Sequence, residues 1–161
     1  MGNTSILNLK TYVMALNFNQ YAREGNAFLK DYAKKLNMPD DTDKAGRILS
    51  SILHGLREVI TIEESLQLIS QFPMFLKAVY VNRWTTRKKK KVKNMVEFID
   101  LIRELDGVTS INDFGSDEIA ENYINSTFMQ LRKYVSLGEL EDIRTVLPKD
   151  LKSIVYQNLM F

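Results

Sequence analysis

His54 is the one histidine of the chain and the first residue whose type could do chemistry. A histidine acts as a general base or a metal ligand only with a partner, which is a nucleophile, a carboxylate or further ligands within reach. Ser50 lies four residues earlier and shares its helix face, and Glu58, one turn later, is the nearest acid that could orient the ring. Ser51 and Arg57 complete the polar neighbours along the chain. We predict a half-buried structural histidine, hydrogen-bonded to the main chain or to a carboxylate; catalysis at His54 is the alternative.

Two arginines, Arg57 and Arg132, precede glutamates that open shorter helices, Glu64 and Glu139. An arginine that ends a long helix and faces the carboxylate of the next one usually forms a structural ion pair or caps main-chain carbonyls. The alternative is an anion-binding site. In that case His54, Arg57 and Arg132 would line one pocket.

The strongest charge feature is the stretch from residue 87 to residue 93, which we name the basic segment. It puts six positive charges into seven residues, namely Arg87, Lys88, Lys89, Lys90, Lys91 and Lys93. The net charge is +2, so removing these six leaves the other residues at −4. Such a segment is typical of a solvated linker, and phosphates of nucleic acid are the alternative ligand. Single-strand binding would need stacking aromatics, and only Trp84 lies close by in the sequence.

Composition excludes several kinds of chemistry. The 161 residues contain no cysteine, which removes disulfides and thiol nucleophiles and favours a cytoplasmic location. No stretch has the layout of a signal peptide or of a membrane span. Glycine-rich phosphate loops and the GxSxG and HExxH motifs are absent from the sequence. We therefore predict a protein that is not an enzyme and holds no cofactor.

One acidic cluster, Asp40, Asp41 and Asp43, resembles the start of a calcium loop. A calcium loop needs glycine at its sixth position and glutamate at its twelfth, where this chain has Ala45 and Ser51. The cluster instead suits the first turn of a helix, whose dipole favours negative charge. No metal site is predicted.

The apolar residues recur with helical spacing along nearly the whole chain, which predicts an all-α protein. A stripe over residues 6–16 is followed by an expected helix at 18–36 and by a long helix ending near Val59. Thr61 to Glu64 has the pattern of a capping box, in which the hydroxyl accepts from an amide and the glutamate reaches back. Its helix presents Ile62, Leu66, Ile69 and Phe72, and Pro73 opens the next helix.

The same order of signals returns 75 residues later. Thr61 corresponds to Ser136, Glu64 to Glu139 and Pro73 to Pro148, while His54 corresponds to Met129. We interpret this as an internal duplication and predict a helical bundle of two tandem four-helix units. The expected parts are an N-terminal helical addition at 1–25, a first repeat at 26–84, a basic linker at 85–93 and a second repeat at 94–161.

Four short strings in order resemble a known family. They are LHGLR at residues 53–57, TIEE at 61–64, QFPM at 71–74 and YVNRW at 80–84. The chain here is similar to bacterial proteins of domain-of-unknown-function family number 2267, over roughly residues 18–84, with the second half as a degenerate copy. Arg83 stands where many members have glycine. The resemblance implies a small helical bacterial protein and no assigned activity.

We predict a non-enzymatic binding or interaction module that acts through grooves between helices. Its expected partner is another protein or a second copy of the chain. The alternative is weak binding of nucleic acid or another polyanion through Arg87–Lys93.

Overall fold

A computed structural model describes residues 16–85 and 89–159. Within these ranges every regular element is a helix, as predicted. The α-helices are α2 (Phe18–Lys35), α3 (Thr42–Val59), α4 (Ile62–Gln71), α5 (Met74–Val81), α6 (Met95–Asp106), α7 (Ser110–Asp113), α8 (Asp117–Leu131), α9 (Leu137–Val146) and α10 (Lys152–Leu159). Two 3₁₀ turns, η1 (Gly107–Thr109) and η2 (Lys149–Leu151), precede α7 and α10. None of the helices in the described part of the chain is long and apolar enough to cross a membrane.

The helices begin where the sequence places capping side chains. Asp41 accepts a hydrogen bond from the amide of Lys44 at 3.0 Å, so the acidic cluster does open a helix. Thr61 and Ser136 cap α4 and α9 in the same way. The predicted return bond from the glutamate to the capping residue is wrong in both helices. Glu64 Oε2 has no hydrogen-bond partner among the described residues, and the amide of Ser136 donates to Gln71 Oε1 at 2.8 Å instead.

The apolar face of α3 is buried as predicted, whereas the predicted face of α4 is buried only in its second half, fully at Phe72 and partly at Ile69. Ser65, Leu68 and Phe72 are buried on or next to α4, whereas Ile62 and Leu66 are more than half exposed. Ser65 can be buried because its hydroxyl lies 2.7 Å from the hydroxyl of Tyr80 on α5. The prediction was therefore wrong for Ile62 and Leu66 and correct for Phe72.

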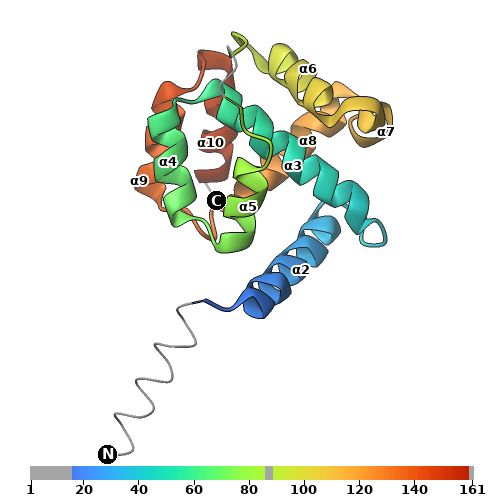
Figure 1. Cartoon of the computed structure of the whole chain (residues 1–161). Helices are drawn as coiled ribbons and strands as arrows, with labels where there is room; N and C mark the ends of the chain where they lie inside the picture. Colours follow the sequence, from blue (N-terminus) through green and yellow to red (C-terminus); the bar gives the residue numbers. More distant parts are fainter. Residues whose placement is uncertain (1–15, 86–88, 160–161) are drawn as a thin grey trace, which may run out of the picture.

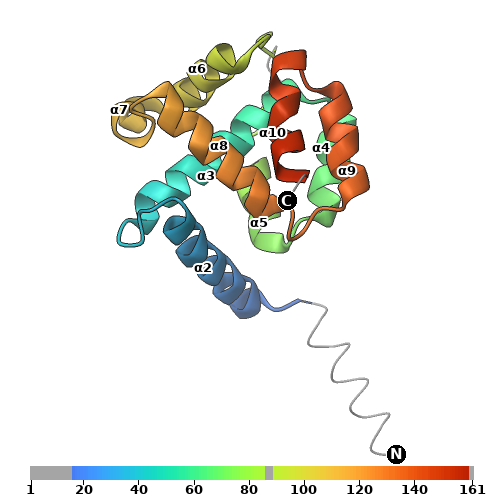
Figure 2. The ribbon, with the colours of Figure 1, turned by 180° about the vertical axis from the view of Figure 1, so that it is seen from behind.

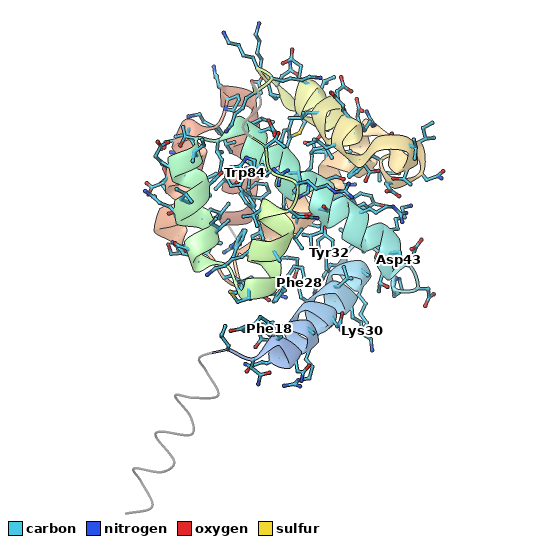
Figure 3. The ribbon with its side chains drawn as sticks, viewed as in Figure 1. Phe18, Phe28, Lys30, Tyr32, Asp43 and Trp84 are labelled. Carbon is cyan, nitrogen blue, oxygen red and sulfur yellow. The ribbon has the colours of Figure 1, made fainter. Side chains whose placement is uncertain are left out.

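Helix α3 lies at the centre of the molecule and contacts α2, α5, α6 and α8 (Figures 1 and 2). Helices α4 and α9 lie together on one side, and α10 packs against α8 and α9. On α2, Phe28 and Tyr32 point toward this body while Lys30 points away (Figure 3). One continuous apolar core joins the first and second halves.

The halves are interleaved rather than set side by side. The helix that leads each half contacts the long helix of the other, α2 against α8 and α6 against α3. The Tyr32 hydroxyl lies 2.7 Å from Thr127 Oγ1, which links α2 to α8. Helices α3 and α8 begin 75 residues apart, as do α4 and α9, but a duplication as the origin of the halves stays a prediction.

Two of the predicted segment boundaries can be compared with the helices of the structure. The boundary between residues 25 and 26 lies inside α2, and the basic linker lies between α5 and α6. Residues 1–15 of the predicted N-terminal addition lie outside the described residues, as do Arg87 and Lys88.

Candidate functional site

His54 is half-buried on α3 and forms a hydrogen bond with the main chain near the end of α5. Its Nε2 lies 2.7 Å from the carbonyl oxygen of Val79. Because a carbonyl oxygen only accepts, Nε2 carries the hydrogen and Nδ1 is the acceptor of the neutral ring. Burial lowers the pKa of His54 below its ordinary value, and the charges of Arg57 and Arg83 act in the same direction, outweighing the bond to Val79. The ring is therefore neutral at pH 7.

Arg57 is buried one turn further along α3 and also binds main-chain carbonyls. Its Nη1 donates to the carbonyl oxygens of Tyr80 at 2.5 Å and Asn82 at 2.8 Å. The guanidinium carbon lies 5.7 Å from the centre of the Trp84 ring, which adds a cation–π contact. Of the two structural roles considered for Arg57, these contacts match the carbonyl cap.

Arg132 lies apart from these two residues. It is the C-terminal cap of α8 and is not among the residues that line the hollow beside His54 and Arg57. The structure thus brings together two residues of the predicted pocket and leaves out the third.

The hollow beside His54 is part of a longer depression along α3. One part, of about 440 Å³, is lined by Ser50, Ser51, His54, Arg57, Glu58, Asn82, Arg83, Thr85 and Leu105. A second part, of about 480 Å³, continues toward the start of α3 and shares Ser50, Ser51, Arg83 and Leu105 with the first. We name the two together the α3 groove. Asp43, labelled in Figure 3 at the start of α3, lines the second part.

Glu58 is the acid of the groove. It lies in the last turn of α3, and only 8% of the residue is exposed. Its carboxylate makes no hydrogen bond or ion pair with another residue in the described part of the chain. This position is unfavourable for a carboxylate, because the last turn of a helix repels negative charge.

Arg83 is the base that both parts of the groove share. Its φ is 59°, a left-handed conformation that costs a residue other than glycine about 1–2 kcal/mol. Its side chain is exposed, and the guanidinium has no hydrogen-bond or ion-pair partner among the described residues. Arg83 thus occupies a backbone conformation that glycine adopts more easily. Its guanidinium is available to bind a ligand.

A network of two carboxylates lies at the other end of the groove, toward the start of α3. Arg47 on α3 donates two hydrogen bonds to Asp113 on α7, at 2.8 and 3.0 Å, and the Asp113 side chain is fully buried. Ser51 donates to Asp106 at 2.8 Å. Burial and the neighbouring Asp113 raise the pKa of Asp106. Burial acts against ionisation of Asp113 too, but the hydrogen bonds and charge of Arg47, together with the hydrogen bonds of Asp106 and Thr109, outweigh it and lower the pKa of Asp113.

The described part of the basic segment is only partly solvated. Lys89 donates from Nζ to the carbonyl oxygens of Arg57 at 3.0 Å and Ile60 at 2.6 Å, so it caps the end of α3. Lys90 pairs with Glu104 at 2.5 Å, while the side chains of Lys91 and Lys93 are exposed. The linker interpretation therefore needs a correction at Lys89, which has a structural partner.

The groove was not predicted from the sequence, although two of its main residues, Glu58 and Arg83, were singled out there. Glu58 was considered only as an orienting acid for His54, and Arg83 only as a departure from a family pattern. The resemblance supplied the available signal, because the family pattern that it implies has glycine at this position and glycine marks a left-handed backbone. Asn82, Thr85 and Leu105 complete the groove from other elements, and nothing in their spacing along the chain indicated this.

Comparison with known proteins identifies a family. A family model described as Uncharacterized conserved protein (DUF2267) matches residues 25–154, which extends the predicted resemblance through the second half. No curated protein matches the chain.

Proposed function

Since the chain belongs to the DUF2267 family of uncharacterized conserved proteins, we propose that it is a non-enzymatic binding module whose binding site is the α3 groove. The observation that carries the proposal is the pair of unfavourable features in the groove, the Glu58 carboxylate in the last turn of α3 and the left-handed Arg83. Features that lower stability and face one cavity are typical of binding sites.

The hydrogen bonds of the groove support binding rather than catalysis. The hydroxyl of Ser51 donates to Asp106 and the Nε2 of His54 donates to Val79, so neither group activates the other. The proposal of a protein that is not an enzyme rests on these engaged side chains.

A thermal-shift screen of the full chain against a library of polar metabolites tests the groove. A ligand at about 100 times its Kd stabilises a protein by about 2.7 kcal/mol, which raises Tm by several degrees at this chain length. We expect at least one compound to stabilise the native protein and to lose its effect in Ser50→Trp, which fills the groove where its two parts meet.

Ser126→Trp is the matched control, because Ser126 lines a separate hollow between the end of α2 and α8. It should retain the stabilisation. A screen without hits would count against the proposal, and so would hits that Ser50→Trp leaves unchanged.

Polyanion binding through Arg87–Lys93 is the alternative, and the exposed side chains of Lys91 and Lys93 favour it. Because Lys89 caps α3 and Lys90 is paired, a clean test replaces only Arg87, Lys88, Lys91 and Lys93 with serine. Binding of a 20-nucleotide duplex DNA should then weaken, and its salt slope should fall by about 0.9 per lost phosphate contact. Unchanged binding would rule out this alternative.

A protein partner or self-association also stays a prediction, as does a cytoplasmic location. The exposed side chains of Ile62 and Leu66 on α4 and Leu137 on α9 support an apolar contact. Light scattering over a range of protein concentrations measures self-association, and a constant monomer mass would argue against it.

A further inference from the structure

The groove presents charges of both signs that have no partner within the described residues. Glu58, a residue of which only 8% is exposed, supplies a carboxylate to the part of the groove beside His54. Arg83 supplies a positive charge at the junction of the two parts. A ligand with a single charge would satisfy one of them and leave the other unpaired.

The other cations near Glu58 have their donors directed elsewhere. Arg57 donates to the carbonyl oxygens of Tyr80 and Asn82, and Lys89 donates to those of Arg57 and Ile60. None of these hydrogen bonds goes to the Glu58 carboxylate. A ligand ammonium group with three donors would provide a hydrogen-bonded partner for it.

The remaining polar groups of the groove suit a small ligand with several donors and acceptors. The Nδ1 of the neutral His54 ring is an acceptor, because its Nε2 is bound to Val79. Ser50 and Asn82 add a hydroxyl and an amide to the same lining, and the volume of about 440 Å³ is within the range of small-molecule sites.

We propose that the α3 groove binds a small zwitterion of the amino-acid class, with its ammonium group at Glu58 and its carboxylate at Arg83. The inference rests on the proposed function and specifies its ligand. A buried acid that recognises the ammonium group excludes simple anions, and a guanidinium that recognises the carboxylate excludes simple amines.

The test uses the full ¹⁵N-labelled chain with the twenty free L-amino acids, their N-acetyl derivatives and their carboxamides. Binding is followed by the amide shifts of residues 50–58 and 82–85 and by the titration of His54. As the one histidine of the chain, His54 gives an unambiguous ring signal. A carboxylate that neutralises Arg83 should raise the pKa of His54, because the Arg83 charge helps to lower it.

We expect at least one free amino acid to bind the groove, and both of its derivatives to bind about tenfold more weakly or not at all. Glu58→Gln should remove the preference for the free form over the N-acetyl form. Arg83→Gly should remove the preference for the free form over the carboxamide, and should raise Tm because glycine relieves the left-handed backbone. Asp43→Asn, which neutralises an acid at the far end of the groove, should keep both preferences.

Four results would overturn the inference. Derivatives that bind as well as the free amino acid would overturn it, as would an equal loss in Asp43→Asn. A lower Tm in Arg83→Gly would mean that Arg83 serves an internal contact. If amino acids leave the groove unchanged while compounds from the metabolite screen bind it, the ligand class is wrong and the proposed function stands; if neither set binds, both are wrong.

Discussion

At the scale of single residues, Glu139 illustrates how a helix cap can conflict with packing. It lies in the first turn of α9, where the helix dipole favours a negative charge. Yet it is buried, and its Oε1 atom has no hydrogen-bond partner. The Oε2 atom of Glu64 on α4 is also buried without a hydrogen-bond partner, and α4 packs against α9. Burial raises the pKa of Glu139, and the charges of Glu64 and Asp142 raise it further.

This raised pKa predicts the sign of a pH effect. The protonated form of Glu139 suits the folded state, so its contribution to stability is present below the unfolded pKa and is lost as pH rises through the folded pKa. Glu139→Gln should therefore increase the free energy of unfolding at pH 7 by about 1 kcal/mol and have little effect near pH 4. Urea denaturation at both pH values measures this.

Glu118→Gln is the control, because Glu118 lies in the first turn of α8 and is exposed. It should bring no gain at pH 7, since only a favourable charge at a helix N-terminus is lost. A gain as large as that of Glu139→Gln would attribute the effect to net charge instead of burial.

At the scale of elements, α3 organises the molecule because its faces pack against helices of both halves. The approach of α6 depends on Gly55, which is buried on α3. A Cβ atom at this position would lie 2.8 Å from Ile102 Cγ1 and 3.4 Å from Phe98 Cε2 on α6. Gly46, on the same helix, faces more open space, with the nearest atoms of Leu29 at 3.9 Å.

The two glycines of α3 therefore predict opposite effects of the same substitution. Gly46→Ala should stabilise the protein by about 0.5–1 kcal/mol, because alanine is the better helix former. Gly55→Ala should destabilise it by about 1–2 kcal/mol, because overpacking against α6 outweighs that gain. Chemical denaturation of both variants measures the difference, and a stabilised Gly55→Ala would contradict the close packing of α3 and α6.

At the scale of the whole molecule, the two halves are joined by polar contacts as well as by the core. Arg47 belongs to the first half and Asp113 to the second, and the Asp113 side chain is fully buried. A buried carboxylate that loses its partner is strongly destabilising. This pair therefore connects the stability of the two halves.

Arg47→Met tests that connection. We expect a loss of about 2–3 kcal/mol at pH 7, below the full penalty for a buried pair because Arg47 itself is 41% exposed. Arg47 lowers the pKa of Asp113, so the stability it provides is present above the unfolded pKa and is lost as pH falls through the folded pKa. The loss should shrink below about pH 4.

Asp113→Asn in the Arg47→Met background should restore part of the stability at pH 7, because it removes the unpaired charge. Double-mutant analysis by urea denaturation measures the coupling. Additive effects of the two substitutions would mean that the pair does not join the halves.

From the sequence alone, the helical class, the first residues of α3, α4 and α9 and much of the core could be predicted. Ile48, Ile52 and Leu56 recur at helical spacing, and Asp41 and Thr61 cap the nearest free amides, so both signals are local in the chain. The family also followed from short local strings.

The α3 groove was decided by the tertiary structure alone. It joins Ser50 and Glu58 on α3, Arg83 after α5 and Leu105 on α6, which are brought together by the packing of helices distant in the sequence. Arg132 shows the converse, since its place in the repeat resembles that of Arg57 but its surroundings differ. Periodicity specifies which face of a helix is apolar, while the partner helix determines which polar residues share a cavity.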